Sequence, residues 1–424
     1  MMEYMPRAEK IISRINELAS VSETPQGITR RYGTAAAAEA GKKVQEWMGA
    51  AGLQVRVDAI GNIRGEWKSE RAGAGRVVIA SHIDTVIDAG RWDGPLGVVM
   101  GVDLLEHVIH SGAKLPFDIE LIAFCDEEGV RFHTTYLGSK VVAGRFERGM
   151  LARKDAEGMS LGEVIGMTGG KVEDLEGDAI SPDQWLGYFE IHIEQGPVLY
   201  EKNVPVALVK GIAGQVRAEV VLKGMAGHAG TVPMDMRNDA LCGAAEFILA
   251  AEELAGRAAS GLVATVGKLQ IANAASNVIP GEVVCSVDIR SADEGVLTQG
   301  HLQLKALCEA IGAKRGLEVV WTVVQASSPV VCDGRLNELL RESIRGAGLE
   351  VVELVSGAGH DAVPISAVSP VCMLFVRCYK GISHHPQEHV ETEDLAAAII
   401  VADEFIHQLS EYGNIRINEI GSKK

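Results

Sequence analysis

Residues 76–85 read Arg-Val-Val-Ile-Ala-Ser-His-Ile-Asp-Thr, an apolar run that ends in a histidine and an aspartate. A short, continuous apolar run predicts a buried strand, and residues 117–125 (FDIELIAFC) repeat the pattern. Helical periodicity over residues 97–110 separates the two runs. Strands that alternate with helices favour an α/β layer with a mainly parallel sheet. His82 would then lie at the carboxyl end of a strand, where such sheets bind ligands.

The pattern changes near residue 212. Alternating runs there predict strands that are half exposed, and helical segments separate them in the order β-α-β-β-α-β, which is ferredoxin-like. The predicted strands are 216–222, 262–269, 282–290 and 317–324, and the predicted helices are 236–254 and 297–313. After residue 330 the α/β pattern resumes with helix 335–347, strand 371–376 and helix 392–411. We therefore expect one domain over 1–212 and 330–424, interrupted by an α+β domain over 213–329.

Composition narrows the function classes. The chain has 424 residues and a formal net charge of −17, which disfavours binding to nucleic-acid phosphates. Residues 1–18 read as a charged amphipathic helix rather than a signal peptide, and no apolar stretch reaches the roughly 18 residues of a membrane span. The seven cysteines are odd in number and lack C-x-x-C spacing, unlike a disulfide framework. A cytoplasmic protein without nucleic-acid or membrane partners is expected.

Candidate chemistry begins at the end of the first strand. His82 can offer one ring nitrogen to a metal while Asp84 holds the other. Asp93 lies on a glycine-flanked turn before a helix, so its side chain escapes helical constraint. Taken alone, His-x-Asp is more typical of a structural histidine with a capping aspartate.

The second predicted strand ends in three adjacent carboxylates, Asp126, Glu127 and Glu128. Their mutual repulsion needs an offset if they are partly buried, and a divalent cation supplies one. Adjacent residues at a strand end point in different directions, so Glu128 and Glu127 can take different tasks, one as a metal ligand and one as a proton carrier. A solvated acidic turn is the alternative for the isolated motif.

Further histidines complete the set. His192 lies in an alternating run, and either His384 or His385, before Pro386, can bind a metal. Mixed His, Asp and Glu ligands without cysteine suit Zn²⁺, Mn²⁺ or Co²⁺. Five ligands exceed the need of one catalytic zinc, and a pair of ions bridged by a carboxylate fits the number.

The chain resembles the metallopeptidase clan of the aminoacylases and bacterial carboxypeptidases. Within that clan it is most similar to the amidase branch, which holds allantoate amidohydrolases, N-carbamoyl-L-amino-acid hydrolases and β-ureidopropionases. The similarity extends from about residue 10 to 410, and its motifs are SHIDT, DGPLG, DEEGVRF, HIEQGPVL, GHAGTVPM, ASNVIPG, GAGHDA and GISHHP. The resemblance implies a catalytic domain with an inserted ferredoxin-like lid through which the protein forms a homodimer.

The resemblance also implies two divalent ions per subunit, Mn²⁺ or Zn²⁺, with Co²⁺ or Ni²⁺ as alternatives. Asp93 would bridge the ions, Asp84 would orient His82, and Glu127 would be the general base. The remaining implied ligands are His82 and His192 for one ion and Glu128 and His384 for the other. His385 departs from the family, which usually has a small polar residue there, and the spacing Ser-His-x-Pro favours His384.

Substrate contacts are implied in the same way. His228 would stabilise the oxyanion, Asn277 and Arg290 would bind a carboxylate, and the residues at the carbamoyl end would be Gln195, Gly359 and His360. The residues themselves leave simpler interpretations open. Arg290 can be a surface arginine paired with Asp288, Asn277 a turn former, and His228 an exposed loop histidine.

Whole motifs are most similar to those of allantoate amidohydrolases, so we expect a small ureido acid, allantoate, as substrate. An N-carbamoyl-L-amino-acid amidohydrolase or β-ureidopropionase is the alternative. A dinuclear peptidase or aminoacylase, and a metal-binding scaffold without catalysis, are less favoured. The division of metal ligands and carboxylate binders between two domains predicts hinges near 211–214 and 328–332 and closure around the substrate.

Overall fold

The computed structural model describes residues 1–257 and 261–421, and side chains up to residue 411. The chain divides into two compact units. Unit 1 comprises Met1–Lys210 and Cys332–Lys424, and unit 2 comprises Gly211–Val331.

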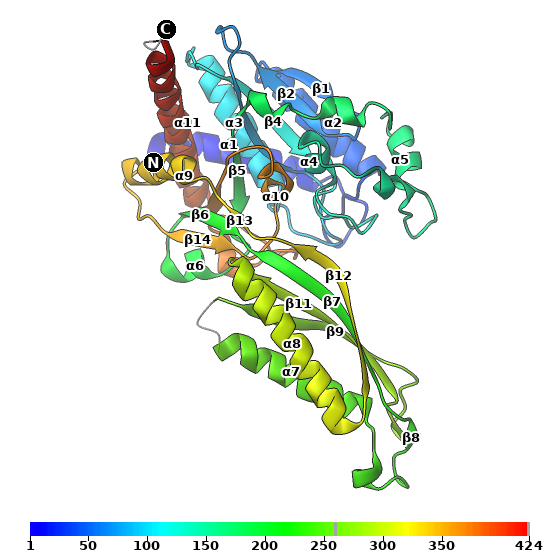
Figure 1. The fold of residues 1–424 in the computed structure, drawn as a ribbon. Helices are drawn as coiled ribbons and strands as arrows, with labels where there is room; N and C mark the ends of the chain where they lie inside the picture. Colours follow the sequence, from blue (N-terminus) through cyan, green and yellow to red (C-terminus); the bar gives the residue numbers. More distant parts are fainter. Residues whose placement is uncertain (258–260, 422–424) are drawn as a thin grey trace. The chain divides into compact units, whose positions relative to one another are not determined.

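Unit 1 is built on a mixed sheet whose strands lie in the order β1-β2-β4-β3-β5-β15-β6 (Figure 1). β14 also pairs with β6, and the last two residues of β6 belong to unit 2, where they pair with β13. The central strands β4, β3, β5 and β15 are parallel, so the expectation of a largely parallel central sheet is confirmed. The bounds are β1 Gln54–Val57, β2 Ile63–Trp67, β3 Arg76–His82, β4 Asp118–Phe124, β5 Trp185–Ile193, β6 Val206–Ile212, β13 Val330–Val331, β14 Glu353–Ser356 and β15 Val371–Val376.

Parallel pairing decides where the functional side chains gather. His82 is the last residue of β3 and pairs with Phe124 of β4, while His192 on β5 pairs with Phe375 of β15. Because the carboxyl ends of parallel strands meet at the same edge of a sheet, the segments that follow these strands converge there.

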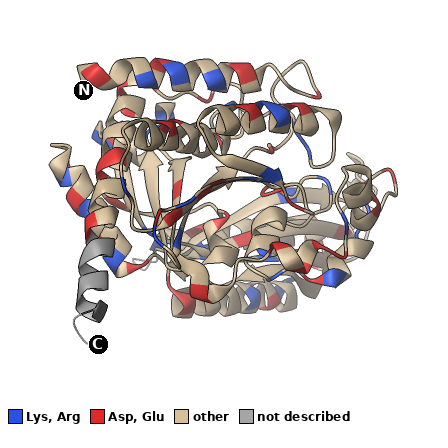
Figure 2. Cartoon of the chain, turned by 90° about the horizontal axis from the view of Figure 1, so that it is seen from above, with Lys and Arg blue, Asp and Glu red and all other residues tan. Residues whose placement is uncertain are grey.

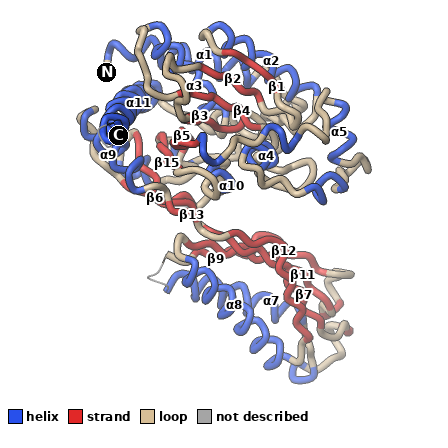
Figure 3. The backbone as a smooth tube through the Cα atoms, turned by 45° about the horizontal axis from the view of Figure 1, so that its top comes forward, coloured by secondary structure: helices blue, strands red, loops and turns tan. Residues whose placement is uncertain are grey.

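Apolar helices cover the sheet. α3 is buried along most of its length, because it lies between the sheet and the helices α1 and α11. α1 and α2 lie with α3 along one face of the sheet, and α4 and α10 lie on the other (Figure 3). The helix bounds are α1 Met5–Ala19, α2 Ala35–Ala50, α3 Pro95–His110, α4 Leu137–Val142, α5 Leu161–Met167, α6 Val198–Lys202, α9 Gly334–Gly346, α10 Ala362–Ile365 and α11 Thr392–Gly421.

Unit 2 contains an antiparallel four-stranded sheet in the order β12-β7-β11-β9, with α7 and α8 on one side of it (Figure 3). Residues of β11 alternate between buried and half-buried, and the buried set packs in the core of the unit. The helix expected over 236–254 begins at residue 240, since 234–236 form a 3₁₀ turn. The bounds are β7 Gly214–Lys223, β8 Gly227–His228, α7 Ala240–Arg257, β9 Val263–Ile271, β10 Val278–Ile279, β11 Glu282–Ser291, α8 Glu294–Arg315 and β12 Glu318–Ser327.

Positively and negatively charged residues both occur along the N-terminal helix (Figure 2). All seven cysteines are free, as expected from their spacing. Among the described residues, no helix combines the length and apolarity that a bilayer crossing requires.

Candidate metal centre

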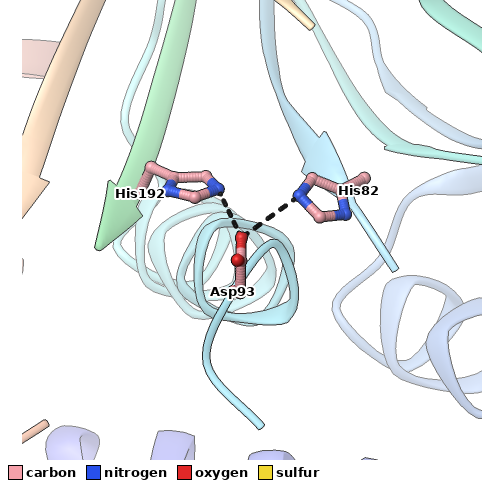
Figure 4. A group of neighbouring side chains, drawn as sticks. All are labelled: His82, Asp93 and His192. Carbon is pink, nitrogen blue, oxygen red and sulfur yellow. Dashed lines mark ion pairs between the residues drawn. The ribbon is translucent and has the colours of Figure 1, made fainter. Parts of the chain in front are cut away.

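Three buried side chains converge at the carboxyl edge of the sheet in unit 1 (Figure 4). His82 ends β3, His192 lies near the end of β5, and Asp93 lies on the turn before α3. Oδ1 of Asp93 is 3.1 Å from Nε2 of His192 and 3.6 Å from Nε2 of His82. One carboxylate oxygen therefore faces two imidazole nitrogens from two neighbouring strands.

Backbone carbonyls decide which ring nitrogens carry hydrogen. Nδ1 of His192 lies 2.9 Å from the carbonyl of Ile193, and Nδ1 of His82 lies 3.1 Å from the carbonyl of Asp84. A carbonyl only accepts, so each Nδ1 must donate, and in a neutral ring Nε2 then presents a lone pair. Nε2 of His192 is buried without a hydrogen-bond donor among the described residues. Lone pairs that face a carboxylate oxygen fit a cation between them.

The other oxygen of Asp93 faces a second group. Oδ2 lies 3.0 Å from Nε2 of His384, which in turn is 3.5 Å from Oε1 of Glu128. Asp93, Glu128 and His384 can offer one ligand atom each within 4.8 Å of one another, as can the first group. The five side chains expected as ligands thus form two groups that share Asp93. The neighbouring His385 accepts from the backbone of Gln387 instead.

A glycine makes the close approach of Asp93 and His82 feasible. Gly94 has φ +82°, and a Cβ there would lie 2.4 Å from the His82 ring. Any other residue would be strained and would displace the imidazole. Pro95 then begins α3, and its fixed φ suits the first helical turn.

The pKa values in this cluster report strong mutual attraction and repulsion. Burial opposes ionisation of Asp93, but without a metal ion the rings of His192, His384 and His82 can be protonated, and their attraction for the carboxylate outweighs burial and holds the pKa of Asp93 well below its ordinary value. Burial, then the charge of Asp93, raises the pKa of Glu128 to about 7. Divalent cations would offset this crowding of acids.

Hydrogen bonds at both its N–H and its carbonyl fix the backbone of Glu127. The Asp84 carboxylate accepts from the N–H of Glu127 at 3.0 Å and from the N–H of Glu128 at 3.1 Å. The carbonyl of Glu127 accepts from the N–H of Tyr136 at 2.9 Å. Burial raises the pKa of Glu127 well above its ordinary value. A buried carboxyl beside the ligands, with a raised pKa, is suited to proton transfer.

Comparison with known proteins identifies the family. Peptidase family M20/M25/M40 matches residues 78–408. The chain belongs to this family. It is 38% identical to allantoate deiminase 2 of Glycine max over 95% of this chain and 89% of that protein. It is 35% identical to the N-carbamoyl-L-amino acid amidohydrolase of Geobacillus stearothermophilus over 96% and 100% of the two chains. The solved hydantoinase/carbamoylase-family amidase of Burkholderia multivorans is 32% identical, with a TM-score of 0.86 over 95% and 97% of the chains.

These matches confirm the expected family and the expected class, a hydrolase acting on C–N bonds other than peptide bonds. M20-family enzymes use a dinuclear divalent-metal site, and the two ligand groups of this chain suit one. The identity of the metal stays a prediction.

Gln195 and His360, two of the residues that we expected to contact the substrate, lie against the candidate metal ligands of this M20-family chain. Gln195 has φ +56° and donates from Nε2 to Oδ2 of Asp93 at 2.7 Å. The buried His360 ring contacts the His192 ring at a centroid distance of 4.5 Å, and its Nε2 is 2.7 Å from Oγ of Ser356. Burial lowers the pKa of His360 well below its ordinary value, which favours a neutral ring. Gly359 leaves no room for a larger residue, because a Cβ there would lie 1.7 Å from the hydroxyl of Tyr136.

The remaining predicted residues lie in unit 2. Nδ1 of His228 accepts from the N–H of Gly230 at 3.1 Å, so a neutral His228 carries its hydrogen on Nε2. Arg290 donates to Asp288 at 2.7 and 3.0 Å, the pairing that the sequence left open. The carbonyl of Asn277 accepts from Ala229 between β10 and β8. Their substrate contacts stay predictions.

The structure adds contacts near the ligands of this M20-family chain that the sequence analysis did not predict. Asp84, which we expected to orient His82, has its Oδ1 3.6 Å from Nδ1 of the His82 ring, and its carbonyl lies 3.1 Å from the same nitrogen. The Asp84 carboxylate also accepts from the backbone N–H of Glu127, a contact that the sequence did not predict. Glu388 and Ser383 lie beside Asp93, and only their place in the GISHHP segment and just after it hinted at this.

Proposed function

We propose that this chain hydrolyses a ureido C–N bond of allantoate and yields ureidoglycine, ammonia and CO₂. The observation that carries the proposal is the sharing of Asp93 by two ligand groups, with Glu127 held beside them. Four relatives named allantoate deiminase, or probable allantoate deiminase, at 37–38% identity support this choice of substrate.

His82 and His192 would hold one divalent ion, and Glu128 and His384 the other, with Asp93 between them. Such ions, when bound, lower the pKa of water and polarise a carbonyl oxygen. Mn²⁺ or Zn²⁺ suits this set of nitrogen and oxygen donors.

Glu127 carries the proton in the proposed reaction. Its carboxylate takes a proton from the attacking water while the oxygen of that water bonds to the carbamoyl carbon. As the C–N bond breaks, Glu127 returns the proton to the leaving nitrogen, which becomes the free amine of ureidoglycine. The carbamic acid that remains separates into ammonia and CO₂. One water is consumed, and Glu127 ends as it began.

We assign substrate contacts to the other polar residues from the hydrogen-bond donors that they offer. Nε2–H of His228 suits the developing oxyanion, since Gly230 already occupies Nδ1. The guanidinium of Arg290 suits the substrate carboxylate through parallel hydrogen bonds, with Asn277 as a second donor. Gln195, Gly359 and His360 would meet the carbamoyl end.

A second candidate substrate is an N-carbamoyl-L-amino acid. The 35% identity to the Geobacillus stearothermophilus enzyme over 96% of this chain favours it. Both substrates present a ureido group near a carboxylate, so the metal ligands and Glu127 would serve either one.

The experiment that tests the proposal measures ammonia release by the Mn²⁺-loaded protein with allantoate and a panel of N-carbamoyl-L-amino acids. Higher kcat/KM for allantoate supports the first candidate, and higher kcat/KM for a carbamoyl amino acid supports the second. Activity on neither overturns both, and di- and tripeptides and acylated amino acids would then be tried.

We also propose a domain closure, an oligomeric state and a cellular location for this chain. Residues 211–331 would serve as a lid and as the surface of a homodimer, and the protein would act in the cytoplasm. Sedimentation velocity tests the dimer, and a scattering profile with and without a substrate analogue tests closure. An unchanged profile would count against a lid.

A further inference from the structure

Glu388 is a buried carboxylate outside the predicted ligand set. Its side chain lies against the turn that carries Asp93, and the residue is only 3% exposed. Oε2 accepts from the backbone N–H of Trp92 at 2.6 Å and from that of Asp93 at 3.1 Å. By accepting two N–H groups on one oxygen, Glu388 holds the backbone of Asp93 in place.

The Glu388 side chain packs tightly against Gly90. A Cβ on Gly90 would lie 2.3 Å from Cβ of Glu388 and 2.5 Å from its Oε2. The glycine therefore allows the carboxylate to approach the turn. Glu388 follows the segment that carries His384, and Asp93 lies 295 residues earlier in the chain. One side chain thus connects two of the three loops that supply ligands to the second group, those of Asp93 and His384.

Ser383 extends the contact to the Asp93 carboxylate itself. Its Oγ is 3.0 Å from Oδ2 of Asp93 and 3.2 Å from Oε1 of Glu388. A serine hydroxyl has one hydrogen, so it donates to only one of these oxygens at a time. When a cation draws on the lone pairs of Asp93, Glu388 remains as the acceptor for this hydrogen. Ser383 can then present its own oxygen lone pairs toward Nε2–H of Gln195, 3.2 Å away.

We propose that Glu388 is a positioning residue that orients Asp93, through the backbone of residues 92 and 93 and through Ser383, so that its two oxygens face the two ligand groups. The inference rests on the proposed role of Asp93 as the shared ligand. Outer residues of this kind typically contribute about 10–100-fold to metal affinity. A merely structural role would change stability and leave metal binding intact.

The test compares the full-length wild type with Glu388→Gln, Glu388→Ala and Ser383→Ala. Glu391→Gln is the matched control, because Glu391 lies three residues away, is exposed and contacts only His389 through its side chain among the described ion pairs. Calorimetric titration with Mn²⁺ alone gives stoichiometry and affinity. Low-temperature EPR of the loaded proteins reports whether two Mn²⁺ ions are exchange-coupled, and the thermal midpoint of each apoprotein reports folding.

We expect the wild type and Glu391→Gln to bind two coupled Mn²⁺ ions. Glu388→Ala should lose about 10–100-fold in affinity for at least one ion, together with the coupling signal. Glu388→Gln, which keeps one acceptor for the two N–H groups, should lose less. Should Glu388→Ala fail to fold, Glu388→Gln and Ser383→Ala decide the matter. Wild-type affinity and coupling in the folded Glu388 and Ser383 variants would overturn the inference alone, whereas a wild type that binds no Mn²⁺ would overturn the proposed metal site as well.

Discussion

The carboxylate of Asp84 accepts the backbone N–H of Glu127 at 3.0 Å. The same carboxylate accepts the N–H of Glu128, so it holds the proposed base and a proposed ligand together. The carbonyl of Asp84 also receives Nδ1–H of His82. A single residue between β3 and the next loop therefore connects a metal ligand to the segment that carries the base.

Asp84→Asn keeps one oxygen acceptor and replaces the other with an N–H₂ group, which would face a backbone N–H. We expect kcat for ammonia release from allantoate to fall about 10–100-fold, as for other outer residues of metal sites. KM should change little, because Asp84 does not touch the proposed substrate. Steady-state kinetics check this, with Asp88→Asn as the control, since the Asp88 carboxylate bonds to Thr24 away from the site. An unchanged kcat in Asp84→Asn would refute the positioning role.

Glu127→Gln removes the proton carrier at nearly constant shape. General-base catalysis is typically worth 10²–10⁴-fold, so kcat should fall by about that factor. Bound Mn²⁺ should stay at the wild-type level, because Glu127 is not a member of either ligand group. Kinetics and metal analysis of the same preparation are the measurements. Full turnover by Glu127→Gln would show that another group moves the proton.

Arg290→Lys keeps the positive charge and loses the planar fork. Hydrogen bonds to a charged group are worth about 1.5–3 kcal/mol, so kcat/KM for allantoate should fall roughly 10–150-fold, mainly through KM. The matched control is Arg257→Lys, an exposed residue that pairs with Glu253. If the KM of Arg290→Lys equals that of the wild type, Arg290 serves only its pairing with Asp288.

Glu120 gives a stability prediction with a defined pH dependence. The residue is buried on β4 and accepts from Nε of Arg64 at 2.5 Å and from Arg76 at 2.5 Å. Burial alone would raise its pKa, but Arg64 and then Arg76 outweigh burial and lower it below the ordinary 4.5. A lowered carboxyl pKa means that the stabilisation is fully present above pH 4.5 and is lost as pH falls through the lower, folded-state value.

Glu120→Gln should therefore cost about 3–5 kcal/mol at pH 7, the usual cost of breaking a buried pair. The difference from the wild type should shrink once the pH drops below 4.5. Urea unfolding at pH 7 and at pH 4 measures both, with the exposed Glu70→Gln as the control. A difference that does not depend on pH would mean that the carboxylate charge is not what stabilises β4.

The sequence by itself determined the elements and the chemistry that depend on local pattern. The apolar runs at 76–81 and 117–125 are β3 and β4, because the burial of a strand shows in its own residues. The motifs also placed His82, Asp93, Glu128, His192 and His384 in one candidate set, and the structure brings all five together. Short strands such as β2 and β14 were missed, since their pairing partners rather than their own pattern define them.

Only the tertiary structure decided how these residues meet. It turned the two oxygens of Asp93 toward different groups, and it brought the carboxylates of Asp84 and Glu388 within hydrogen-bond distance of backbone N–H groups. Each of these contacts joins segments far apart in the chain. Side-chain direction at a strand end depends on which neighbour lies alongside, and that neighbour is chosen by the packing of the whole sheet rather than by the local sequence.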